Sequence, residues 1–103
     1  MAKMTKSTAE KLLADVPGEK RFWCHDGQAL KNPSDLAVAL KDMSEETFSY
    51  HASRNKNDFS NWVRDVIGDE KLSRDLLKSS TRAQAAKSVA SRVTWLMSKM
   101  ATE

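Results

Sequence analysis

The stretch NDFSNWVRDVIGDEKL, residues 57–72, constrains the fold more than any other part of the chain. Its apolar residues recur at intervals of three and four, as on one face of a helix: Phe59, Trp62, Val63 and Val66. Asn57 or Asp58 can cap the start of that helix, because a short side-chain oxygen accepts from backbone N–H groups that lack a helical partner there. Gly68 follows the last turn, where a residue in the left-handed conformation commonly ends a helix. The stretch predicts a helix over residues 58–67.

A second helix is expected directly after this turn, over residues 70–78. Asp69 can cap it, and Leu72 and Leu76 fall on one side, with Leu77 as a further candidate. The pair resembles a helix-turn-helix, but its second helix opens with two acidic residues, which would meet phosphates unfavourably. Each polar residue here has a structural role available. We therefore interpret the stretch as starting and ending two helices rather than binding a ligand.

The N-terminal segment predicts a short helix over residues 8–16, after a disordered tail over residues 1–6. Ser7 and Glu10 match a capping box, in which the hydroxyl accepts from the backbone N–H three residues on and the carboxylate reaches back. Pro17 and the glycine after it would stop the helix.

An aromatic run and a turn signal predict a small two-stranded hairpin near residues 21–31. Phe22 and Trp23 are typical of a strand, and the Asp-Gly pair at 26–27 is a favoured two-residue turn. Trp23 and Leu30 would then face each other across the hairpin. Because two strands alone are marginally stable, the hairpin must pack on helices.

Two further helices are expected after the hairpin. Asn32 is a good cap and Pro33 suits the first helical position. Apolar residues follow at helical spacing: Leu36, Leu40 and Met43. Ser44 begins the next helix, which has two carboxylates at its positive end, and Phe48 and Ala52 lie inward.

The C-terminal helix is predicted to open at Ser80 or Thr81. One face carries apolar residues over about five turns: Ala86, Val89, Val93, Leu96, Met97 and Met100. The helix has basic residues and no acidic one: Arg82, Lys87, Arg92 and Lys99. Trp95 lies opposite Ala86, on the face that Arg92 and Lys99 share. An aromatic ring between cations could stack beside a phosphate contact, pack under the N-terminal helix, or contact another protein.

Composition completes the fold prediction, which is a mainly α, compact bundle of roughly five or six short helices with one small hairpin. Three Gly and two Pro are too few for the turns of a sandwich or barrel, and 103 residues suffice for one core in a single domain, residues 1–103. The predicted core consists of Phe22 or Trp23, Leu36, Leu40, Phe48, Phe59, Trp62, Val63, Val66, Leu72, Leu76, Val89, Val93 and Leu96.

Charge is unevenly distributed along the chain. Residues 1–21 carry +2, residues 22–70 carry −4 and residues 71–103 carry +5, within a net charge of +3. The basic C-terminal third could attract phosphates or an acidic partner. It could equally attract the acidic middle of the same chain or form an ordinary solvated face.

We expect neither a metal site nor a catalytic site. Cys24, His25 and His51 lack the repeated Cys or His pairs of a zinc site, and adjacent residues on a strand point to opposite faces. His51 is expected to bond to a local partner near Asn57 and Asp58. An enzyme built on His51, Asp58 and Cys24 is the remaining catalytic hypothesis, which a large separation of Cys24 from His51 would remove.

Further features bear on location. A single cysteine excludes an internal disulfide framework and fits a reducing cytosol. The N-terminus has no apolar run long enough for a signal peptide or a membrane span. We predict a cytoplasmic protein with no cofactor and no membrane association.

One pattern extends over more than half of the chain, about residues 22–77. An aromatic strand and an Asp-Gly turn precede a Phe-x-x-His step and an Asn-Asp-Phe-x-x-Trp helix start, which consist of Phe48, His51, Asn57, Asp58, Phe59 and Trp62. The run resembles a small uncharacterised helical domain family of archaea and bacteria, found alone or fused to other domains. Because that family has no known function, the resemblance implies no activity and no catalytic residues.

The leading functional hypothesis is a non-enzymatic interaction module that binds another protein. The alternative is weak, sequence-independent binding of nucleic acid through the C-terminal helix. Either contact would use the same candidate residues: Arg82, Lys87, Arg92, Trp95 and Lys99. The sequence leaves the partner's identity and the oligomeric state open.

Overall fold

The computed structural model describes residues 4–53 and 55–101. Within them the chain forms six α-helices, whose bounds are α1 Lys6–Leu13, α2 Pro33–Asp42, α3 Glu45–His51, α4 Asp58–Trp62, α5 Glu70–Lys78 and α6 Arg82–Ala101. A single antiparallel hairpin joins β1, Phe22–Trp23, to β2, Ala29–Leu30. The radius of gyration of 13.1 Å is that of a compact domain of this length. The predicted mainly α bundle with one small hairpin is confirmed.

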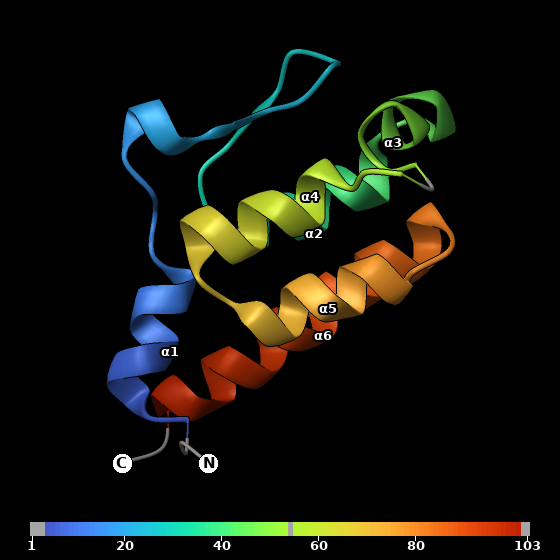
Figure 1. Cartoon of the computed structure of the whole chain (residues 1–103). Helices are drawn as coiled ribbons and strands as arrows, with labels where there is room; N and C mark the ends of the chain where they lie inside the picture. The colour runs from blue at the N-terminus through green and yellow to red at the C-terminus, as the bar shows by residue number, and fades with distance from the viewer. Residues whose placement is uncertain (1–3, 54, 102–103) are drawn as a thin grey trace.

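The long helix α6 is the element on which α1, α2 and α5 pack (Figure 1). α2 and α5 lie along it, and α1 lies against its C-terminal end. α4 runs beside α5, and the hairpin projects from the side of the molecule remote from α6. Since α5 and α6 lie side by side, the outer surface of this pair is available to solvent.

The predicted core residues are buried with one exception, and the core also takes in Leu12, Leu30 and Met43. Phe22 takes the aromatic position of the hairpin and stacks on Phe59 at 5.2 Å between ring centroids. Phe48 stacks on the same ring at 5.9 Å. Val66 is only partly buried, at the edge of the core. The remaining predicted core residues are buried: Leu36, Leu40, Trp62, Val63, Leu72, Leu76, Val89, Val93 and Leu96.

The predicted helix caps are present in the middle of the chain. Asn32, Ser44, Asn57 and Asp69 each accept a hydrogen bond from the backbone N–H three residues on, over 2.8 to 3.1 Å. Thr81 does the same for Gln84 at the start of α6. These side chains satisfy N–H groups that the helix itself leaves without partners.

The predicted start of the first helix was wrong. Thr5, not Ser7, is the cap, and its Oγ1 accepts from the N–H of Thr8 at 3.1 Å. α1 therefore begins at Lys6 rather than residue 8 and ends at Leu13 rather than residue 16. Of the predicted disordered tail, residues 1–3 lie outside the described residues, while Thr5 and Lys6 belong to the helix start.

The hairpin differs from the prediction in its pairing and its turn. Phe22 lies opposite Leu30, while Trp23 pairs with Ala29 and is 65% exposed. Phe22 points inward because it can stack on the ring of Phe59 there. The turn is also longer than two residues, since the N–H of Gly27 donates to the carbonyl of Cys24 at 2.9 Å. Within this turn Gly27, but not Asp26, has a positive φ, of 97°.

The predicted helix over 58–67 changes geometry halfway. α4 continues into a π-helical turn, Val63–Ile67, and Gly68 ends it with a φ of 89°. The N–H groups of Gly68 and Asp69 both donate to the carbonyl of Val63, at 2.8 and 3.1 Å. This turn brings α5 back beside α4, where Ser60 and Ser73 exchange hydrogen bonds.

Part of the predicted apolar face of α6 is not buried. Ala85 is buried while Ala86 is partly exposed, and Met97 is 55% exposed. Leu96 packs on Ala9 and Leu12 of α1, so the neighbouring position 97 turns outward. Leu77 is likewise 62% exposed, because Leu76 takes the inward place on α5.

Candidate functional site

The basic C-terminal helix is joined to the acidic middle of the chain. The guanidinium of Arg92 donates from Nε and Nη2 to the two oxygens of Asp69, at 2.8 and 3.0 Å. The side chains of Arg92 and Asp69 are 10% and 2% exposed. Asp69 also caps α5 through Leu72. Arg92, a predicted contact residue, is therefore part of the internal structure.

Arg82, another predicted contact residue, is also engaged within the chain. Its Nε donates to Glu45 at 2.8 Å, and its Nη1 donates to the carbonyls of Leu40 and Lys41 at 2.8 and 2.7 Å. These carbonyls belong to the last turn of α2, where the helix dipole favours a cation. Both Arg82 and Arg92 therefore bind the acidic middle of the same chain, which is one of the interpretations left open for the basic C-terminal third.

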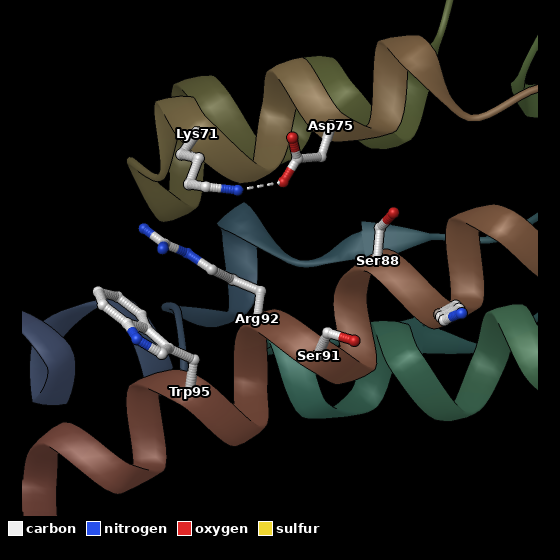
Figure 2. Close-up of a pocket in the computed structure, with 7 residues that line it drawn as sticks. Lys71, Asp75, Ser88, Ser91, Arg92 and Trp95 are labelled. Carbon is white, nitrogen blue, oxygen red and sulfur yellow. Dashed lines mark hydrogen bonds and ion pairs between the residues drawn. The ribbon is translucent and has the colours of Figure 1, made fainter.

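A hollow of about 610 Å³ lies between α5 and α6. Figure 2 shows Lys71 and Asp75 on α5 above it, bridged at 2.7 Å, with the other side chains rising from α6. The full lining is Lys71, Asp75, Lys87, Ser88, Ser91, Arg92 and Trp95. Two of these, Lys87 and Trp95, are predicted contact residues that remain exposed.

Trp95 forms one end of this hollow. The guanidinium of Arg92 lies 4.8 Å from its ring centroid and the ammonium of Lys99 lies 5.1 Å from it. The three side chains therefore share a face, as the spacing predicts. Trp95 is 40% exposed, so it is not buried within the chain. A large aromatic side chain held between two cations and open to solvent can supply contact area to a ligand.

His51 has a structural role, and Asp58 is its local partner, as predicted. Its Nε2 accepts from the N–H of His25 at 2.9 Å, and its Nδ1 lies 3.0 Å from Asp58. Since Nε2 accepts, Nδ1 carries the proton and donates it to the carboxylate. His51 is 5% exposed and joins the hairpin, α3 and α4. Neither ring nitrogen is left to act on a substrate.

The other residues of the Asn-Asp-Phe-x-x-Trp pattern also have internal roles. Asn57 caps α4 and donates from its amide to the carbonyl of Leu76 at 3.3 Å. Phe59 lies in the core, and the indole N–H of Trp62 donates to the carbonyl of Lys20 at 2.8 Å. The structural interpretation of this stretch agrees with these contacts.

Cys24 is not placed as a nucleophile. It is 5% exposed, and burial, followed by the nearby charge of Asp26, raises the pKa of its thiol to about 11. The thiol therefore keeps its proton at neutral pH, whereas a catalytic cysteine needs a thiolate. Among residues 4–53 and 55–101, no three His, Cys, Asp or Glu side chains come together as metal ligands would.

Four lining residues of the hollow were missed from the sequence: Lys71, Asp75, Ser88 and Ser91. The spacing of Lys71 and Asp75, four apart on an exposed helix face, was a signal for their bridge. None of the helices in the described part of the chain combines the length and apolar character needed to cross a membrane. Comparisons with protein-family models, with curated proteins and with solved structures found no match.

Proposed function

We propose that this chain is a non-enzymatic interaction module that binds another protein, and that the contact is made at the hollow between α5 and α6. The observation that carries the proposal is Trp95, which is 40% exposed at the edge of that hollow. Tryptophan and arginine are the side chains that most often dominate the binding energy of protein interfaces. Arg92, held by Asp69, lies against one face of the exposed indole and fixes its position.

The charges of the hollow favour a protein over nucleic acid. Binding of nucleic acid depends on several phosphate contacts from free cations. Arg82 and Arg92 are already bonded to carboxylates and carbonyls of the same chain. Lys71 is bridged to Asp75, so its charge is partly neutralised within the hollow. The aromatic ring between cations and the exposed Lys87 are the features that favour nucleic acid.

An enzymatic role has less support. Because its pKa is raised, the Cys24 thiol is not present as the thiolate that the catalytic hypothesis needs. Both ring nitrogens of His51 are already in hydrogen bonds within the chain. The single polar pair of the hollow, Lys71 and Asp75, neutralises itself. A binding surface needs none of these groups to be reactive.

Photo-crosslinking tests the proposal in the cell of origin. A benzophenone amino acid replaces Ser91 in the hollow, and in a matched control it replaces Lys11, which is exposed on α1. We expect a discrete protein adduct from position 91, absent from position 11 and strongly reduced when Trp95→Ala is added. Adducts with nucleic acid alone, or the same adducts from both positions, would overturn the proposal. Anisotropy of labelled DNA over a salt series measures the alternative directly.

A further inference from the structure

The hollow at Trp95 is the middle of a longer groove along α6. A second hollow of about 370 Å³ shares Asp75, Lys87 and Ser88 with it and reaches Gln84. A third, of about 520 Å³, shares Ser91 and Trp95 and reaches Ser98. Because they share lining residues, the three hollows adjoin one another along α6, and we call the series the groove. At about 1.5 Å per residue, α6 rises roughly 21 Å from Gln84 to Ser98.

Five of the nine residues of α6 that line this groove lie on one stripe of the helix. Gln84, Ser88, Ser91, Trp95 and Ser98 follow one another at intervals of four, three, four and three. This alternation is the spacing of a single helix face, so the five residues form a continuous stripe along the groove. The serines are short enough to let a second backbone approach, while Trp95 is the one large projection. The shape of the groove therefore suits a helix lying nearly parallel to α6.

The rim of the groove is predominantly basic. Lys71 and Lys78 come from α5, Lys87 comes from α6, and Lys99 lies over the ring of Trp95. The only carboxylate in its lining, Asp75, is bridged to Lys71, and α6 itself contains no acidic residue. An acidic ligand is therefore attracted. A second copy of the same face would meet its own positive charge, which disfavours a symmetric dimer here.

We infer that the groove binds an acidic amphipathic helix of a partner protein. The helix needs about four turns to match the groove, small or apolar residues on the seam that faces Ser88 and Ser91, and carboxylates on its flanks toward the lysines. A small residue is required opposite Trp95, because the indole fills the space there. This inference rests on the proposed function and specifies the partner of the same site.

A designed peptide tests the inference with the full-length chain. The probe is a fluorescein-labelled helical peptide of about 18 residues, with Ala and Leu on one seam and Glu on both flanks. Two peptides serve as controls: one has Lys in place of every Glu, and one has the same composition in scrambled order. We expect anisotropy to show at least roughly tenfold tighter binding of the Glu helix than of either control, weakening as salt rises.

Variants of the groove locate the binding. Ser91→Arg fills the groove and Lys87→Glu reverses part of its rim, and each should weaken binding roughly tenfold or more. Lys11→Glu on α1 makes the same charge change as Lys87→Glu outside the groove and should leave binding within about twofold, apart from long-range charge. Thermal unfolding identifies any variant that fails to fold. Because Ser91 and Lys87 are both exposed, at least one folded variant is expected.

The results separate this inference from the proposed function. Equal binding of the Glu helix and its scrambled form would overturn the inference, and so would binding that neither groove variant weakens. If position 91 still crosslinks to a protein in that case, the proposed function stands and only the acidic helix is wrong. Displacement of the Glu helix by single-stranded DNA at comparable concentration would instead overturn the choice of a protein partner.

Discussion

Breaking the ion pair between Arg92 and Asp69 on one side should strongly destabilise the fold, although the sequence presents Arg92 as a surface cation. Replacing Arg92 by Met removes two charge-assisted hydrogen bonds of 2.8 and 3.0 Å. The Asp69 side chain, 2% exposed, then remains charged with the N–H of Leu72 as its described partner. Breaking a buried pair on one side costs about 3–5 kcal/mol. The expected loss is therefore a large share of the roughly 5–15 kcal/mol that stabilises a small domain.

Urea and thermal unfolding measure this loss. For a domain of this size, 1 kcal/mol lowers Tm by about 4–8 °C, so Arg92→Met should lower it by at least about 12 °C. Arg74→Met is the matched control, because Arg74 is 65% exposed and lies 4.0 Å from Glu70 on the surface of α5. Such a surface pair contributes about 0–1 kcal/mol.

A double-mutant cycle tests whether the pair itself is responsible. Asp69→Asn keeps an oxygen to cap α5 but removes the charge. Adding it to Arg92→Met should restore part of the lost stability, because no isolated carboxylate then remains buried. If Arg92→Met unfolds within about 0.5 kcal/mol of the Arg74→Met control, the pair is not stabilising and the reasoning is refuted. A charge reversal at Arg92 would for the same reason be a poor test of binding, since it would test folding.

Three further changes test other parts of the structure. His51→Ala leaves the N–H of His25 without its acceptor and Asp58 without a donor. It should lower the free energy of unfolding in urea by about 2–4 kcal/mol, and a loss below about 0.5 kcal/mol would contradict these hydrogen bonds. Gly68→Ala places a side chain at a φ of 89° and should cost about 1–2 kcal/mol, whereas Gly18→Ala, with open space and no positive φ, should not. Burial raises the pKa of Cys24 from 9.0 to about 11, so the stabilising contribution of its protonated thiol is complete below pH 9 and lost as the pH rises toward 11. Over this range the free energy of unfolding should fall by up to about 2–3 kcal/mol more in the wild type than in Cys24→Ala, and parallel pH curves would refute this.

Local chemistry was readable from the sequence because capping involves residues three positions apart. Asn32, Ser44, Asn57 and Asp69 are the caps that their side chains predict. The failure at α1 has the same origin, since Thr5, Ser7 and Thr8 offer hydroxyls within one turn and sequence alone does not rank them. The inward aromatic of the hairpin was ambiguous for another reason. It depends on Phe59, a residue far away in the chain.

The groove was only half visible in the sequence. Trp95 stands out as an aromatic residue between cations, so the face that it shares with Arg92 and Lys99 could be predicted from helical spacing, whereas its exposure could not. The internal role of Arg92 could not, because its partner Asp69 lies on a different helix and looks, in sequence, like a cap alone. Ser88 and Ser91 could not be singled out from the sequence, since small polar residues occur on any exposed helix face.

The buried thiol of Cys24 makes local opening of the hairpin measurable. It is the single cysteine of the chain and lies where the hairpin meets the core, with its N–H bonded to the carbonyl of Gln28 at 2.8 Å. A thiol reagent at pH 8 can reach it only when the hairpin lifts away, which also returns the pKa to its ordinary range. The labelling rate therefore counts opening events. When the labelling rate is measured with and without a helical peptide bound at α6, it reports whether binding on that side of the bundle reduces opening of the hairpin.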